Sequence, residues 1–307
     1  FIPNSGGLLH KGFEINNEVR LNNLGFHDIN RRPEQTTNPR VLVLGDSFVA
    51  AAEVPVDKGW TQGIERELAD TAVEVINLGI SGTGTDQHLA VLQHYAPQFK
   101  PDLVILAFYQ NDFEDIRVER KLACAGENIL VFQTTAQKEN ILNFIEEHRP
   151  SPFIRWLGEN WYLFRAVAPF LDKDNILLQT NTIAPGTIDM DIEPAKELEP
   201  GQLDALFNTF LAQAEAEDFQ FIIIPIPDRD NPSASLETLK AEVSPDILKE
   251  LIILDVGETI ANKAAADGRE YKELYYIYDS HFNEDGYRLL GEAVAEAIRP
   301  YLDSANP

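Results

Sequence analysis

The sequence predicts an α/β fold built on a doubly wound parallel sheet. Short apolar runs recur along the chain, and stretches with helical periodicity lie between them. Strands that follow one another through helices form right-handed crossovers, so a ligand site is expected beyond their carboxyl ends. The length of 307 residues suits one large domain or two small ones.

Five segments have the continuous apolar character of strands that are buried on both faces. In chain order they are Arg40–Gly45, Val73–Leu78, Asp102–Phe108, Phe219–Ile226 and Leu251–Val256. The first of them, RVLVLG, is an uninterrupted apolar run that ends in glycine.

Helices are predicted between the strands from the spacing of apolar residues. Trp60, Ile64 and Leu68 recur four residues apart, which predicts a helix over Gly59–Ala69. The other predicted helices are Thr85–Tyr95, Gly201–Glu217, Glu258–Ala266 and Asn283–Leu302.

Two regions depart from this alternation. Residues 1–39 are rich in Asn, Gly and Pro, and the alternating stretch Phe13–Leu21 indicates one hairpin. We expect them to form an N-terminal arm packed on a main domain of residues 40–307. At about residues 113–200 the alternation stops over a length too great for an ordinary loop, which predicts an inserted cap.

The predicted cap is helical around Phe153–Phe170 and rich in aromatic residues, including Trp156, Trp161 and Tyr162. These side chains either form a small core of their own, which is the simpler interpretation, or line an acyl pocket.

The charge balance excludes some classes of partner. The chain has 50 acidic and 25 basic residues, a net charge of −25, which repels nucleic acid and anionic lipid surfaces. Cys124 is the one cysteine, so neither an internal disulfide nor a thiolate-built zinc site is expected. We interpret Cys124 as a small, partly buried apolar residue.

Residues with catalytic potential follow the predicted strands. They are Gly45-Asp46-Ser47, Asn77–Gly82 and Tyr109–Asp112, together with Asp279–Asn283 before the last helix. Acyl transfer needs a serine, a histidine to take its proton and a carboxylate to orient the histidine. It also needs backbone N–H groups or an amide to bind the oxyanion.

Each of these residues has a structural alternative when it is taken alone. Ser47 and His281 are also candidates for helix capping, and Gly82 and Asn111 for turns. Asp46 and Asp112 are expected to hold their loops by hydrogen bonds. The Gly-x-Ser-x-Gly elbow, the Walker motif and the dinucleotide-binding motif are absent from the sequence.

Taken together, Gly45-Asp46-Ser47, Gly82, Asn111 and His281 match in order the four blocks of the SGNH (GDSL-type) hydrolases. The chain resembles this family from about Val41 to Leu302, apart from the insertion. The resemblance implies a flavodoxin-like three-layer α/β/α sandwich that hydrolyses or transfers acyl esters without a metal or an organic cofactor.

The resemblance also implies roles for single residues. Ser47 corresponds to the nucleophile and His281 to the general base. The N–H groups of Ser47 and Gly82 and the amide of Asn111 correspond to the oxyanion hole.

The sequence departs from the family pattern at three positions. Phe48 replaces the leucine of the first block, and Tyr109 stands where the third block usually has glycine, which narrows the pocket or brings a phenol to the substrate. The family acid usually lies three residues before the histidine, at Tyr278, so we expect Asp279 to be the triad acid instead. If Asp279 points away, His281 acts in a dyad with a backbone carbonyl.

The segment Asn22–Phe26 is similar to the lead-in of a bacterial SGNH subgroup whose members often carry an N-terminal anchor or export signal. The chain begins at Phe1 rather than Met, and no stretch approaches the ~20 apolar residues of a membrane span. We expect an exported protein, whether periplasmic, extracellular or tethered through a preceding segment.

The sequence therefore predicts a serine ester hydrolase acting on a small-molecule or polysaccharide acyl ester. An acetyl esterase or O-acyltransferase of extracellular polysaccharide is the alternative enzyme. A non-catalytic carbohydrate-binding or scaffold protein on a degenerate SGNH fold is the alternative from another class. Neither the acyl chain length nor an oligomeric state is predicted.

Overall fold

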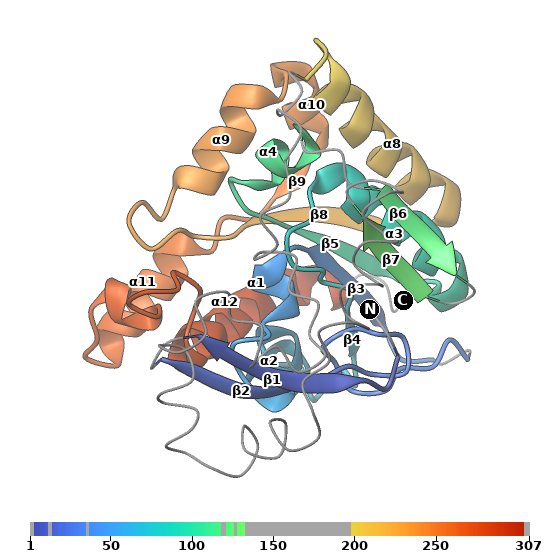
Figure 1. Cartoon of the computed structure of the whole chain (residues 1–307). Helices are drawn as coiled ribbons and strands as arrows, with labels where there is room; N and C mark the ends of the chain where they lie inside the picture. The colour runs from blue at the N-terminus through green and yellow to red at the C-terminus, as the bar shows by residue number, and fades with distance from the viewer. Residues whose placement is uncertain are drawn as a thin grey trace.

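The computed structural model describes residues 3–11, 14–34, 37–117, 121–125, 128–132 and 198–303. At its centre lies a five-stranded parallel sheet with the strand order β4-β3-β5-β8-β9 (Figure 1). The strands are β3 (Arg40–Gly45), β4 (Glu74–Asn77), β5 (Leu103–Phe108), β8 (Gln220–Pro225) and β9 (Ile252–Ile253). β3 pairs with β4 on one side and with β5 on the other, so the direction of winding reverses at β3.

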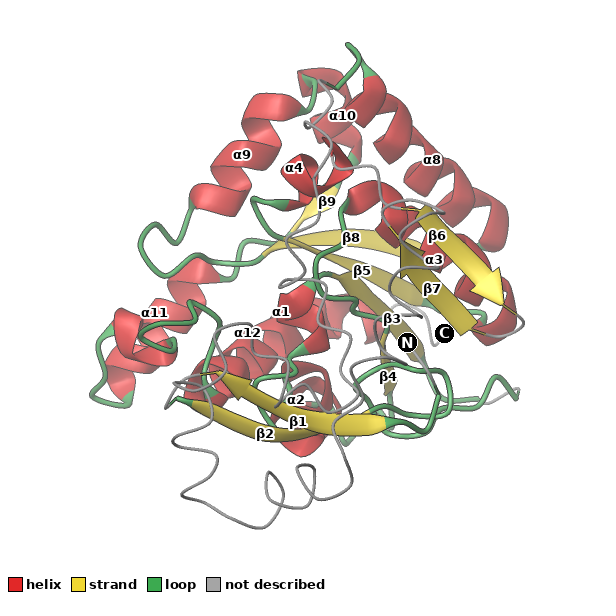
Figure 2. Ribbon diagram, in the orientation of Figure 1, coloured by secondary structure: helices red, strands yellow, loops and turns green. Residues whose placement is uncertain are grey.

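Helices cover both faces of this sheet (Figure 2). The face with Val41 and Val43 packs against α2 (Trp60–Glu67), α11 (Gly257–Ala266) and α12 (Glu284–Asp303). The face with Leu42 and Leu44 packs against α3 (Thr85–Phe99), α8 (Gln202–Glu217), α9 (Ala234–Glu242) and α10 (Pro245–Glu250). Successive strand residues point to opposite faces, which is why continuous apolar strands build two cores and three layers.

The predicted fold class is confirmed, with differences at particular elements. The predicted strand Leu251–Val256 is wrong in length, because β9 spans only two residues at the edge of the sheet. The chain turns there at Asp255, whose Oδ1 accepts the N–H of Gly257 at 3.0 Å. Helices α9 and α10 were not predicted.

The N-terminal segment contains an antiparallel hairpin of β1 (Gly6–Lys11) and β2 (Ile15–Arg20). Ile15 and Val19 on β2 are buried, and the amide of Asn17 donates to the carbonyls of Ala52 and Val54 at 2.8 and 2.7 Å. These contacts fix the hairpin to the segment that follows α1 (Ser47–Ala50). The division of the chain into an arm and a main domain stays a prediction.

The region of the predicted cap is described in part. α4 (Asp112–Arg117) follows β5, and β6 (Lys121–Ala125) pairs with β7 (Asn128–Phe132). The predicted helix Phe153–Phe170, its aromatic residues and the side chain of Cys124 lie outside the described residues. Among the helices that are described, none combines the length and the apolar character that crossing a membrane requires.

Candidate active site

Ser47 lies at the turn from β3 into α1, at the carboxyl end of the strand. In the sheet β3 lies between β4 and β5. Gly45 is required at this turn, because a Cβ there would lie 2.4 Å from Val49 Cγ2 and 2.9 Å from the carbonyl oxygen of Ala107. Asp46 caps the helix, since its Oδ1 accepts the N–H of Phe48 at 2.9 Å. The capping role that was the structural alternative for Ser47 therefore belongs to Asp46.

Ser47, His281 and Asp279 form one chain of hydrogen bonds. Ser47 Oγ lies 2.8 Å from His281 Nε2, and His281 Nδ1 lies 2.5 Å from Asp279 Oδ1. Ser280, between the two loop residues, adopts a left-handed conformation with φ +70°. The structure thus brings Asp279 to His281, and its role as the triad acid stays a prediction.

The loop that carries His281 is closed by backbone hydrogen bonds. The N–H of Tyr276 donates to the His281 carbonyl at 2.9 Å, next to an isolated bridge between Tyr275 and Phe282. The capping role that was open for His281 falls to Asn283, whose Oδ1 accepts the N–H groups of Asp285 and Gly286 at 3.1 Å. The imidazole is therefore free for the contacts with Ser47 and Asp279.

The electrostatics of the site suit a histidine base. Burial alone would raise the pKa of Asp279, but hydrogen bonds from His281 and Lys11 outweigh it and lower this pKa to about 2. Burial also disfavours the charged form of His281 and would lower its pKa. The Asp279 hydrogen bond and the charges of Glu53 and Asp279 outweigh this effect, so the pKa of His281 is raised. Asp279 is therefore a carboxylate at neutral pH and stabilises positive charge on His281.

The predicted oxyanion donors follow the strands on either side of β3. Gly82, with φ +71°, comes after β4, and Asn111 comes after β5. Asn111 Nδ2 donates to Asp115 Oδ2 at 3.2 Å, which occupies one of the two amide hydrogens. The role of Gly82 and Asn111 in binding an oxyanion stays a prediction.

The loop of Gly82 is held by buried polar contacts. Thr83 Oγ1 donates to the carbonyl of Ile80 at 2.6 Å and accepts a hydrogen bond from His88 Nε2 at 3.0 Å. Burial lowers the pKa of His88 to about 3, so this histidine is neutral and structural.

Asp46 and Asp112 are both buried beneath the site. Asp46 caps α1. Asp112 holds the loop after β5, because its Oδ2 accepts the N–H of Tyr109 at 3.1 Å. Burial raises the pKa of Asp46 to about 6 and that of Asp112 well above its usual range. These contacts agree with the loop-holding role expected from the sequence.

Phe48 packs between two rings of the site. Its ring centroid lies 4.5 Å from that of Tyr109 and 4.7 Å from that of His281. The hydroxyl of Tyr109 donates to Asp228 Oδ2 at 2.7 Å, across the ends of β5 and β8. The phenol is therefore engaged by a carboxylate that the sequence pattern did not single out.

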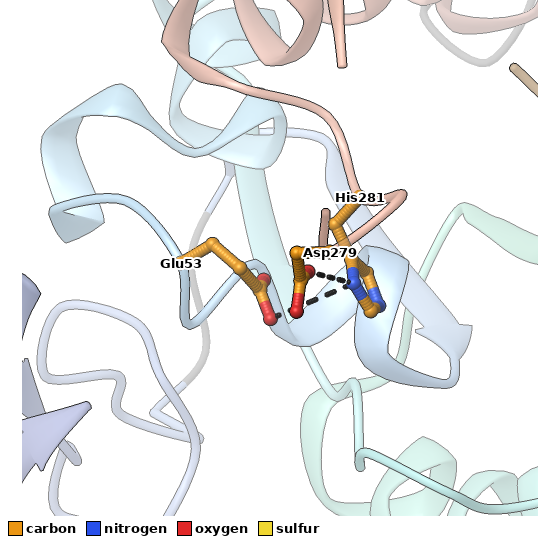
Figure 3. Close-up of side chains that lie close together, drawn as sticks. All are labelled: Glu53, Asp279 and His281. Atoms are coloured by element: carbon orange, nitrogen blue, oxygen red, sulfur yellow. Dashed lines mark hydrogen bonds and ion pairs between the residues drawn. The ribbon is translucent and has the colours of Figure 1, made fainter. Parts of the chain in front are cut away.

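Glu53 and Lys11 also meet the site, and neither was predicted. Figure 3 shows the carboxylates of Glu53 and Asp279 close to the His281 ring. Lys11 Nζ lies 2.7 Å from Asp279 Oδ2 and 3.3 Å from Glu53 Oε1. No motif includes either residue. Lys11 reaches the site on the N-terminal hairpin, and Glu53 lies on the segment after α1 against which the hairpin packs.

Glu53, Asp279 and His281 offer side-chain atoms within 4.8 Å of one another, the donor types of a metal site. The Lys11 ammonium already contacts both carboxylates, so a metal ion would have to displace it. We therefore interpret these residues as part of the hydrogen-bond network around His281.

A parallel α/β sandwich with a serine, a histidine and a carboxylate joined at its carboxyl edge is typical of serine hydrolases. Residues 41–294 match the model of the GDSL-like lipase/acylhydrolase family. The chain belongs to this family, as the sequence resemblance predicted.

The chain is similar to curated esterases over a limited part of its length. It is 39% identical over 75 residues to an arylesterase of Vibrio mimicus, covering 24% of this chain and 38% of that protein. It is 33% identical over 81 residues to the esterase TesA of Pseudomonas aeruginosa, covering 26% of this chain and 40% of that protein. The chain thus spans about two fifths of the length of these relatives.

Among solved structures, the crystal structure of TesA aligns with 85% of this chain and 99% of its own, with a TM-score of 0.46 and 16% identity. An esterase structure from Pseudoalteromonas sp. aligns with 87% of this chain and 100% of its own, with a TM-score of 0.44 and 15% identity.

Proposed function

We propose that this protein hydrolyses carboxylic esters through a Ser47-His281-Asp279 triad. The unbroken chain of hydrogen bonds from Ser47 Oγ to His281 and on to Asp279 carries the proposal. In the resting state His281 Nδ1 holds a proton that it donates to Asp279, which leaves Nε2 as the acceptor for the Ser47 hydroxyl.

In the first half-reaction, Ser47 Oγ bonds to the ester carbonyl carbon while its proton moves to His281 Nε2. The carbonyl electron pair moves onto oxygen, and the N–H groups of Ser47 and Gly82 and the amide of Asn111 donate hydrogen bonds to the oxyanion that forms. The carbon–alkoxy bond then breaks, and the alcohol leaves with the proton from Nε2. The acyl group remains as an ester of Ser47.

In the second half-reaction, water gives a proton to His281 Nε2 and its oxygen bonds to the acyl carbon. The carbon–Oγ bond breaks, Ser47 takes the proton back and the free acid leaves. If a sugar hydroxyl takes the place of water, the same steps transfer the acyl group, which is the transferase alternative.

The experiment is hydrolysis of p-nitrophenyl esters from acetate to palmitate by the wild type and by Ser47→Ala. The expected result is wild-type activity and a loss of at least ~10⁴-fold in the variant. A short-chain optimum would favour an acetyl esterase, and a long-chain optimum a lipase-like enzyme.

Equal rates in the two proteins would overturn the role of Ser47. A wild type that is inactive on these esters and on acetylated polysaccharide would favour the non-catalytic alternative.

A further inference from the structure

The β1–β2 hairpin contacts the loop that carries Asp279 at two points. At its turn, the Glu14 carboxylate accepts the N–H of Ile277 at 2.7 Å on one oxygen and the N–H of Tyr278 at 2.8 Å on the other. These are the two residues immediately before Asp279. The side chains of Ile277 and Tyr278 are 74% and 86% exposed, so apolar packing of those side chains does not hold this part of the loop.

At the end of β1, Lys11 contacts the carboxylate of Asp279 directly. Its Nζ lies 2.7 Å from Oδ2, while Oδ1 of the same carboxylate bonds to His281. The two oxygens of Asp279 are thus divided between the hairpin and the histidine. This arrangement fixes the rotation of the carboxylate, and a charge-assisted contact of this length is a strong one.

Lys11 also balances a second carboxylate near the histidine. Glu53 is 5% exposed, and its Oε1 lies 3.3 Å from Lys11 Nζ and 3.9 Å from His281 Nδ1. A buried carboxylate that loses its cationic partner is strongly unfavourable, so the contact with Lys11 stabilises Glu53 in its place beside the imidazole.

The hairpin does not depend on Lys11 for its own position. Asn17 bonds to the backbone on both sides of Glu53, and Ile15 and Val19 on the same strand are buried. Lys11 is therefore presented to Asp279 by a hairpin that is anchored elsewhere.

We propose that the β1–β2 hairpin completes the active site, with Lys11 and Glu14 as positioning residues that hold Asp279 and its loop against His281. This inference rests on the proposed function, because it assigns a role to residues around the triad of that function. It extends the site to a part of the chain that precedes the first strand of the sheet.

The charges around His281 predict opposite shifts of its pKa when Lys11 or Glu53 is replaced. The titratable groups that face it or its loop are Lys11, Glu14, Asp46, Glu53, Tyr109, Tyr276, Asp279, Glu284 and Tyr287. Within this set Lys11 lowers the pKa of His281, and Glu53 raises it. Removing Lys11 therefore stabilises the imidazolium, and removing Glu53 destabilises it.

The experiment measures kcat/KM for p-nitrophenyl acetate against pH in wild type, Lys11→Met, Glu53→Gln and Lys11→Arg. Because His281 acts as a base in its neutral form, Lys11→Met moves the acid limb of the profile to higher pH, and Glu53→Gln moves it to lower pH. At pH 7, Lys11→Met loses about tenfold in kcat with little change in KM, because Lys11 holds the carboxylate that orients the base. Lys11→Arg, which keeps the charge, restores most of the rate and the wild-type limb.

Lys249→Met is the matched control, because the exposed side chain of Lys249 makes a 2.8 Å ion pair with the exposed side chain of Asp246 on α10. Its profile and rate should equal those of the wild type. Thermal unfolding of each variant separates a loss of fold from a change at the site, and Glu53→Gln gives an independent shift if Lys11→Met unfolds.

Acid limbs of Lys11→Met and Glu53→Gln that coincide with the wild type would overturn the inference, even with Ser47→Ala inactive. A wild type without Ser47-dependent activity would instead overturn the proposed function itself.

Discussion

The two sides of the candidate site are held in different ways. Ser47 begins the short helix α1, in which the next residues, Phe48 and Val49, are almost completely buried. The turn before Ser47 is packed against Val49 and the Ala107 backbone. Asp279 lies between the exposed residues Tyr278 and Ser280, and residues more than 200 positions earlier in the chain contact it and its loop. The nucleophile is therefore positioned by the packed sheet and its turn, and the acid by contacts from a distant part of the sequence.

This difference implies that the two sides respond differently to mutation. Changes at the serine turn should alter folding stability first, because a rigid core surrounds it. Changes at the hairpin should alter catalysis first, because the loop can shift by a fraction of an ångström without exposing the core.

The largest effect is expected at the acid itself. Asp279→Asn removes the acceptor that fixes the His281 tautomer, and kcat should fall about 10³–10⁴-fold, as in other serine triads. Steady-state kinetics on a p-nitrophenyl ester measure this. Asp246→Asn, an exposed acid paired with Lys249, is the control and should keep the wild-type rate. A loss below tenfold in Asp279→Asn would show that His281 works without this carboxylate.

At the serine turn, mutation is expected to lower folding stability. Gly45→Ala should lower the free energy of unfolding by about 2–3 kcal/mol, because its Cβ overlaps Val49 and the Ala107 backbone. Gly201→Ala is the control, since a Cβ there meets nothing within 4 Å and adds only the cost of its left-handed φ of +80°, about 1 kcal/mol. Urea unfolding measures both values. An equal cost at the two glycines would contradict a tightly packed turn.

At the β1–β2 hairpin, mutation is expected to lower the catalytic rate. In Glu14→Gln, a neutral amide replaces the carboxylate that accepts two N–H groups, so kcat should fall about three- to tenfold with little loss of stability. Glu18→Gln on the same hairpin, where the exposed carboxylate bonds to Arg20, should leave kcat unchanged. If Glu14→Gln lowers the melting temperature and leaves kcat at the wild-type value, the hairpin stabilises the fold and not the site.

The smallest effect is expected at Tyr109. Its hydroxyl bonds to Asp228 and its ring packs on Phe48, so Tyr109→Phe keeps the packing and should change kcat/KM by less than about threefold. The p-nitrophenyl acetate assay measures it. A much larger loss would mean that the hydroxyl contacts the substrate and that the phenol belongs to the catalytic machinery.

The parts of the molecule that were predictable from sequence are those with local signals. Arg40–Gly45 and Leu103–Phe108 are uninterrupted apolar runs, and the structure has strands there with buried residues throughout. Ser47 and His281 stand in family blocks, and the parallel sheet brings the loops after neighbouring strands to one edge.

What was not predictable depends on long-range packing. Lys11 and Glu14 have no motif, and they reach the Asp279 loop only because buried residues of β2 anchor the hairpin beside α1. Helix α9 was missed because it buries only Ser235 and Leu239, too few residues to show a periodic apolar face. β9 is shorter than its apolar run because the chain turns away from the sheet at Asp255.

The central claim is that His281 activates Ser47 as a nucleophile. The most direct test is the intact mass of the protein after reaction with a fluorophosphonate, followed by peptide mapping, for wild type, Ser47→Ala and His281→Ala. We expect one adduct on Ser47 in the wild type, none in Ser47→Ala, and labelling at least ~10²-fold slower in His281→Ala. A wild type that gains no adduct, or one that is labelled at another residue, would contradict it.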